Sequence, residues 1–136
     1  MEITVDFPGG LRVDAHFDSF TVRTDQPKED GGDGSAPAPF EFFLTSLATC
    51  AGIYVLQFCN ARGIDTSGIR LKQCVERNEI TYKVEKISIE IELPQTFPQK
   101  YTAAVMRSAE QCSVKKTMEN PPVFDIRVTT PSKVLN

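Results

Sequence analysis

The stretch PFEFFLTSLATCAGIYVLQFCNARG, residues 39–63, decides the fold of this chain. Proline suits the first turn of a helix because its missing N–H would have no partner there. Glu41 places a carboxylate in the same turn, where it complements the helix dipole. Gly63 is typical of the residue that ends a helix. We therefore predict a helix from Pro39 to about Arg62, roughly 35 Å long at the usual rise per residue.

This predicted helix is apolar nearly all round, because residues 42–61 contain no charged side chain. A stretch of that length can span a bilayer. However, Thr, Ser, Gly, Gln and Asn interrupt it, and neither an aromatic belt nor basic residues mark its ends, unlike a membrane segment. We predict a helix buried in a protein core, enclosed by a sheet or a partner subunit.

The residues before this helix alternate between apolar and polar. Residues 2–25 show a period of two with turns at 8–10 and 18–19, which predicts a three-stranded antiparallel meander. Residues 26–38 are rich in Gly, Pro, Asp and Ala and predict a loop of the length that is often functional or mobile.

The residues after the helix predict two strands, two helices and a closing strand. Alternation favours strands near 69–76 and 86–93. Helical spacing favours helices at 98–111 and 112–119. Val123, Ile126 and Val128 favour a last strand. The predicted order β-β-β-α-β-β-α-α-β is typical of an α+β fold, in one domain over residues 1–136.

Composition excludes several classes of function. The net charge of −3 and the lack of a Lys/Arg cluster argue against nucleic-acid binding. The N-terminus, MEITVDFPGG, lacks the features of a signal peptide, so we expect a cytoplasmic protein that does not bind membranes. With His16 as the single histidine and no CxxC pair, we expect no metal site and no cofactor.

The four cysteines are the candidates for chemistry. In a reducing cytoplasm a disulfide is usually transient and catalytic, but a free cysteine is more often a small buried apolar residue. Cys59 and Cys74 fit that structural role. Cys112 begins a predicted helix and precedes Lys115 and Lys116, a setting that lowers a thiol pKa. Local chemistry alone therefore predicts that Cys112 is more acidic than Cys50, which lies inside the long helix.

Two motifs together resemble the OsmC/Ohr family. They are Pro39-x-Glu41-x-x-Leu44-x-x-Leu47-x-x-Cys50 and the later Cys112-Ser113-Val114. The resemblance covers essentially the whole chain, including the loop that leads into the helix. It implies an intertwined homodimer in which sheets from both subunits enclose the long helices, with active sites at the dimer interface.

The resemblance also implies a chemistry. Cys50 is the expected peroxidatic residue, attacking an organic hydroperoxide and becoming a sulfenic acid. Cys112 is the expected resolving residue, condensing with it to a disulfide that an external thiol reduces, a lipoyl group or another dithiol. Glu41 is the expected supporting residue. Phe40, Phe42 and Phe43 suit an apolar substrate pocket or ordinary core packing.

Two departures place the chain in a divergent branch of that family. In classical organic hydroperoxide resistance proteins the carboxylate directly follows the proline, whereas here Phe40 intervenes before Glu41. One residue turns a helix by about 100°. The family's activating arginine lies in the N-terminal hairpin, where Arg12 and Arg23 do not match its motif.

Two other functions stay open from sequence. The chain could be a non-catalytic OsmC-like dimer that binds a small apolar ligand at its interface, or a purely structural fold with buried cysteines. The position of Cys112 at a helix start favours the peroxidase, which involves oxidative-stress chemistry.

Overall fold

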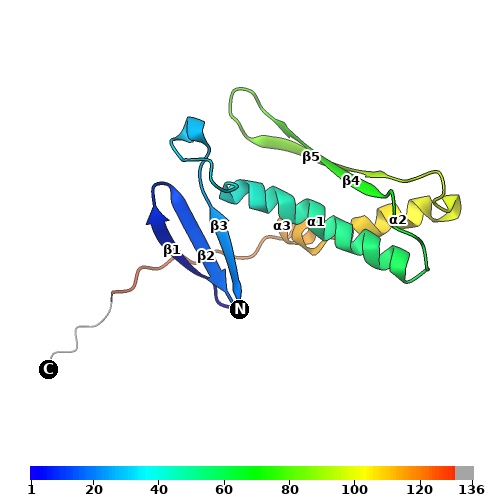
Figure 1. The fold of residues 1–136 in the computed structure, drawn as a ribbon, viewed down its shortest axis with the longest axis horizontal. Helices are drawn as coiled ribbons and strands as arrows, with labels where there is room; N and C mark the ends of the chain where they lie inside the picture. Colours follow the sequence, from blue (N-terminus) through cyan, green and yellow to red (C-terminus); the bar gives the residue numbers. More distant parts are fainter. Residues whose placement is uncertain (131–136) are drawn as a thin grey trace.

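Helix α1, Pro39–Asn60, runs through the middle of the computed structural model, which describes residues 1–130 (Figure 1). Glu41 accepts a hydrogen bond from the Ala38 N–H at 2.8 Å, which closes the first turn beside Pro39. Gly63, just beyond the helix, has a φ of +61°, a conformation that favours glycine. The predicted helix and both of its ends are confirmed.

The N-terminal meander is also confirmed. Strands β1 (Thr4–Gly9), β2 (Arg12–Phe17) and β3 (Phe20–Thr24) form an antiparallel sheet in the order β1-β2-β3. Phe17 pairs with Phe20 across a two-residue turn in which Asp18 has a φ of +48°. Short polar residues such as Asp tolerate this conformation better than most.

The second half of the chain forms a hairpin and two short helices. Strands β4 (Arg70–Arg77) and β5 (Val84–Glu92) pair antiparallel, with Leu71 opposite Ile91. A 3₁₀ turn, Gln99–Tyr101, leads into α2 (Thr102–Ala109), and α3 (Ser113–Glu119) follows. These elements match the predicted ones within a few residues. The α+β class with antiparallel sheets is therefore confirmed.

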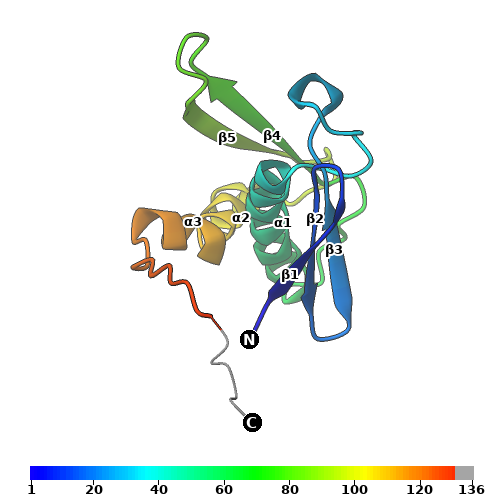
Figure 2. The ribbon, with the colours of Figure 1, turned by 90° about the vertical axis from the view of Figure 1, so that its left-hand side faces the viewer.

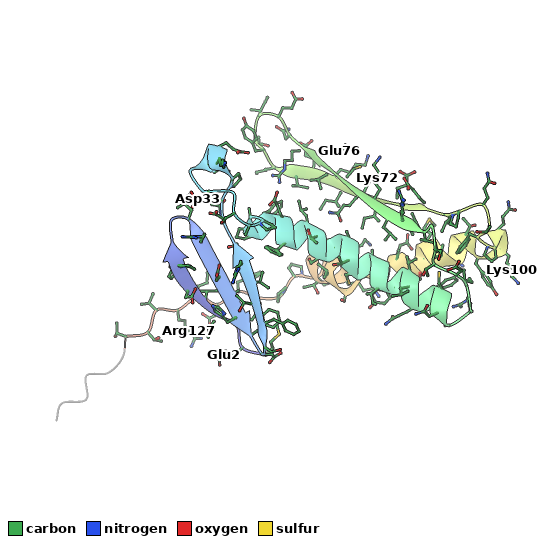
Figure 3. The ribbon with its side chains drawn as sticks, viewed as in Figure 1. Glu2, Asp33, Lys72, Glu76, Lys100 and Arg127 are labelled. Atoms are coloured by element: carbon green, nitrogen blue, oxygen red, sulfur yellow. The ribbon has the colours of Figure 1, made fainter. Side chains whose placement is uncertain are left out.

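The β4–β5 hairpin covers one side of α1, while α2 and α3 lie beside it (Figures 1 and 2). Apolar side chains on the inner face of β4 and β5 meet α1 and α2. The core centres on Val55, Cys59, Phe97 and Val105. Lys72 and Glu76 lie on the outer side of β4, away from α1 (Figure 3).

The loop between β3 and α1 is held by a buried carboxylate. Asp25 accepts hydrogen bonds from the Ser35 hydroxyl at 2.7 Å, the Ser35 N–H at 2.9 Å and the Gln26 N–H at 2.8 Å. The two Ser35 bonds, partly opposed by burial, hold the pKa of Asp25 down to about 2. A Cβ at Gly32 would lie 2.0 Å from the Gln26 carbonyl oxygen, so the loop requires glycine there. This loop presents α1 in a fixed position.

The predicted closing strand is wrong for the described chain. Residues 121–130 form no strand. Val123 and Ile126 are 96% and 93% exposed. A strand needs a neighbouring edge for its N–H and C=O groups, and within residues 1–130 this segment pairs with none. The predicted domain end, residues 131–136, lies outside the described residues.

Residues 1–130 enclose helix α1 in part. Its buried residues form one stripe, Leu47, Ala51, Val55 and Cys59, while Ile53 and Leu56 on other faces are 45% and 40% exposed. Its most apolar window has a mean hydropathy of 1.6 and is 22% buried. By length and composition α1 could cross a membrane, which is weak evidence because core helices of soluble proteins meet the same test. The part of the chain that the structure describes buries one stripe of this helix.

Candidate active site

The structure brings Cys50 and Cys112 together. Cys50 lies half-buried on α1, and Cys112 is buried at the residue that caps α3. Both are free thiols, and each affects the pKa of the other. The packing of α3 against α1 joins two residues far apart in the sequence.

Ser113 completes this cluster. Its Oγ atom lies 3.5 Å from the Sγ atom of Cys50. The backbone of Ser113 and Val114, at the start of α3, also lowers the pKa of the Cys50 thiol. Cys112 makes different contacts: its sulfur accepts a hydrogen bond from the Lys115 N–H at 3.4 Å and donates to the Leu47 carbonyl oxygen at 3.9 Å. The hydroxyl beside Cys50 thus suits a thiolate, whereas the contact of Cys112 with the Leu47 carbonyl oxygen needs the thiol proton.

The pKa values of the two thiols shift in opposite directions. Burial raises the pKa of Cys50, but the hydrogen bonds from the Ser113 hydroxyl, the Val114 N–H, Cys112 and the Ser113 N–H outweigh it, and the pKa falls to about 7. Burial is also the largest influence on Cys112, and it raises that pKa with help from the neighbouring Cys50. A thiolate next to a protonated thiol is the arrangement needed for attack followed by disulfide formation.

The prediction that Cys112 is the more acidic thiol is therefore wrong. It assumed that Lys115 and Lys116 would act on Cys112. In the structure Lys115 Nζ lies 2.8 Å from the Glu119 carboxylate, and Lys116 Nζ lies 2.5 Å from the Gln111 side-chain oxygen. The desolvation of Cys112 raises its pKa by more than the backbone of Lys115 and Val114 lowers it.

Glu41 lies apart from the two thiols. Its carboxylate accepts the Ala38 N–H in the first turn of α1. Nine residues separate it from Cys50, about 13 Å along a helix axis. Arg12, one of the two arginines of the N-terminal hairpin, donates to the Gly9 carbonyl oxygen at 3.0 Å. Within one chain, Glu41 is a capping residue, and its predicted supporting role stays a prediction.

The remaining cysteines differ from this pair. Cys59 is fully buried in the core, and that burial raises the pKa of its thiol. Cys74 is exposed on β4, opposite Ser88. Neither is placed beside Cys50 or Cys112 by a described contact. Among residues 1–130, no cluster of three or more His, Cys, Asp or Glu side chains could hold a metal ion.

Apolar hollows flank the thiols on two sides. A groove of about 420 Å³ lies between β5 and α2 and reaches Ala51 and Lys115, and a smaller hollow of about 150 Å³ is lined by Leu47 and Cys112. On the other side of α3, Phe43, Val114 and Phe124 line an almost wholly apolar hollow of about 340 Å³. Phe43 thus fits the predicted apolar pocket, while Phe40 stacks on Phe43 with ring centroids 5.4 Å apart.

Ser113 is the residue of this site that had no assigned role from sequence. Ser113 is part of the Cys112-Ser113-Val114 motif. Its position directly after a candidate cysteine at a helix start is the sequence feature that could have indicated a role. Which distant thiol its hydroxyl would meet depends on how α3 packs on α1.

The family model described as OsmC-like protein matches residues 32–127, well over half of the chain. The chain belongs to the OsmC-like protein family. The match includes α1, so this helix is part of the OsmC-like domain. A comparison with curated proteins gave no match.

Three solved structures are similar to this OsmC-like chain. A Psychrobacter arcticus 273-4 protein, described as an osmotic stress induced and detoxification response protein, is 26% identical with a TM-score of 0.71, covering 85% of each chain. An OsmC-like protein from Mycoplasma pneumoniae is 16% identical with a TM-score of 0.69, over 88% of this chain and 87% of that one. A Legionella pneumophila protein, described as an organic hydroperoxide resistance protein OsmC and predicted redox protein, is 18% identical with a TM-score of 0.56, over 86% and 87%.

Proposed function

We propose that this OsmC-like protein is a thiol-dependent peroxidase that reduces organic hydroperoxides. The observation that carries the proposal is the neighbouring pair of thiols with opposite pKa shifts, Cys50 lowered to about 7 and Cys112 raised. A purely structural pair of core cysteines does not need a hydroxyl beside one sulfur, as Ser113 lies beside Cys50. The Legionella protein of the same fold is associated by name with organic hydroperoxides.

The reaction has three steps. The Cys50 thiolate attacks the terminal oxygen of the hydroperoxide, so that an S–O bond forms, the O–O bond breaks and the alkoxide leaves to be protonated as the alcohol. The Cys112 sulfur then displaces hydroxide from the Cys50 sulfenic acid, giving a disulfide and, with the Cys112 proton, water. An external dithiol, such as a lipoyl group, exchanges with this disulfide and restores both thiols.

A homodimer is part of the proposal. Within residues 1–130, nothing covers the exposed apolar residues of α1 or those of the N-terminal sheet. Phe7 on β1, for example, is 78% exposed. Monomeric soluble proteins rarely leave large apolar patches uncovered. A second copy can enclose α1 between sheets of both subunits and give residues 121–130 an edge to pair with. We expect this dimer to be cytoplasmic.

A thiol titration tests the function. Stoichiometric cumene or tert-butyl hydroperoxide should remove two free thiols per chain and yield a Cys50–Cys112 disulfide by peptide mass spectrometry. Cys50→Ser should abolish the reaction, whereas Cys74→Ser, which removes an exposed thiol elsewhere, should leave it intact. Thiols that all titrate freely after treatment would refute the peroxidase.

The competing function is a dimer that binds a small apolar ligand without turnover. The groove of about 420 Å³ beside β5 favours this alternative, because isoleucines and Leu93 line it. An apolar ligand that co-purifies with the protein, combined with thiols inert to peroxide, would support binding over catalysis.

A further inference from the structure

The Ser113 hydroxyl has one side-chain partner within the described chain, the sulfur of Cys50 at 3.5 Å. Ser113 is the first residue of α3, yet it does not cap that helix, because the Cys112 sulfur accepts the Lys115 N–H at 3.4 Å. The hydroxyl is exposed and free to rotate toward Cys50. Capping of α3 therefore does not explain why this hydroxyl lies beside Cys50.

The charged groups around the two thiols have other partners. Lys115 pairs with Glu119, also lies near Glu110 and adjoins Cys112 rather than Cys50. Lys116 binds Gln111, and on α1 the carboxylate of Glu41 is engaged at Ala38. The described hydrogen-bond partner of the Cys50 sulfur is thus a neutral group, the Ser113 hydroxyl. The backbone of Ser113 and Val114 and the Cys112 side chain, also neutral, lower the Cys50 pKa as well.

We propose that Ser113 is a catalytic residue that donates a hydrogen bond from its hydroxyl to the Cys50 thiolate and keeps it charged and oriented for attack. This role rests on the peroxidase function proposed above. Hydrogen bonds to an ionised partner are about twice as strong as neutral ones. Ser113 keeps its own proton throughout: the sulfur forms the S–O bond, the O–O bond breaks, and water protonates the departing alkoxide.

The test measures the Cys50 pKa without any peroxide. The full chain is alkylated with iodoacetamide over pH 5–10, and fragment-ion mass spectrometry separates Cys50 from Cys59, which share one tryptic peptide. Ser113→Ala should raise the midpoint by about one pH unit, the size expected for losing a hydrogen bond to a charged group. Ser113→Thr, which retains the hydroxyl, should keep the wild-type midpoint.

Ser46→Ala is the matched control. Ser46 lies one turn before Cys50 on α1, but its hydroxyl donates to the Phe43 carbonyl oxygen at 2.6 Å, so its removal should not move the midpoint. With peroxide, Ser113→Ala should be about fivefold slower than wild type at pH 7 and nearly equal at pH 10, since it lowers only the thiolate fraction.

An unchanged midpoint in Ser113→Ala, with circular dichroism showing an intact fold, would overturn the proposal. Two further outcomes distinguish a failure of the proposed peroxidase function from a failure of the proposed role of Ser113. If wild-type Cys50 ignores peroxide while Ser113→Ala still raises its pKa, the hydrogen bond stands without the catalytic function. If peroxide oxidises Cys50 in both proteins at equal rates at pH 7, the peroxidase stands and the role of Ser113 is lost.

Discussion

The sulfur of Cys112 accepts the N–H of Lys115 at 3.4 Å, so the proposed resolving thiol is also the cap of α3. One atom thereby serves the start of a helix and the chemistry of the pair. Capping holds Cys112 in place at the start of α3. Burial raises the pKa of its thiol, although the Lys115 N–H acts in the opposite direction.

Substitutions at Cys112 should separate these two roles. Cys112→Ser keeps an acceptor at the cap, because serine is a favoured N-cap residue, whereas Cys112→Ala removes it at a cost of about 1 kcal/mol. We expect urea unfolding to show Cys112→Ala as less stable than Cys112→Ser by about that amount. Equal stability of the two variants would contradict the capping role.

Both variants should stop the proposed reaction at the same stage. Without a resolving thiol, the Cys50 sulfenic acid should persist after one equivalent of hydroperoxide and react with dimedone, adding its mass to the peptide of residues 29–62. A disulfide between Cys50 and Cys59 or Cys74 in place of the dimedone adduct would show that another thiol resolves the sulfenic acid.

The reaction of Cys50 with peroxide should follow its ionisation. The reactive form is the thiolate, so the rate should rise with pH and reach half its maximum near the pKa of about 7. Below that pH it should fall about tenfold per pH unit. Stopped-flow measurements with cumene hydroperoxide from pH 5 to 9 check this, and a midpoint near 9, typical of a free thiol, would contradict the activated site.

Sequence patterns predicted most of the fold because helix ends and strand alternation depend on residues that are close in the sequence. Pro39, Glu41 and Gly63 define the ends of α1 by chemistry within one turn, and the period of two set the strands of both sheets. The closing strand failed for the opposite reason: Val123 and Ile126 have strand-forming side chains, but pairing depends on an edge that one chain does not offer.

The pair Cys50 and Cys112 was available from family resemblance, but their relative acidity was not. Lys115 and Lys116 lie close to Cys112 in sequence, yet one pairs with Glu119 and the other with Gln111. The groups that act on Cys50 come from α3, across a helix contact. Burial and the direction of hydrogen-bond donors depend on tertiary packing. At this site they affect the pKa values of the two thiols more than the neighbouring lysines do.

The loop before α1 should be intolerant of a side chain at Gly32. The new Cβ of Gly32→Ala would lie 2.0 Å from the Gln26 carbonyl oxygen, so backbone must move and the bonds from Ser35 and Gln26 to Asp25 must loosen. We expect a loss of about 1–3 kcal/mol, the range for overpacking. Asp33→Ala, in the same loop and exposed, is the control that should unfold at the wild-type urea concentration.

The apolar surface of α1 gives the sharpest test of the proposed dimer. Ile53 and Leu56 are 45% and 40% exposed although they lie on the most apolar helix of the chain. If a second copy covers them, Leu56→Asp places an unpaired carboxylate in a desolvated interface, at a cost of several kcal/mol. The dimer dissociation constant, measured by sedimentation velocity, should rise about 100-fold or more. Lys72→Glu, a charge change on the outer side of β4 (Figure 3), should leave it unchanged. If wild type and Leu56→Asp both sediment as monomers, α1 is covered by something other than a second copy of this chain.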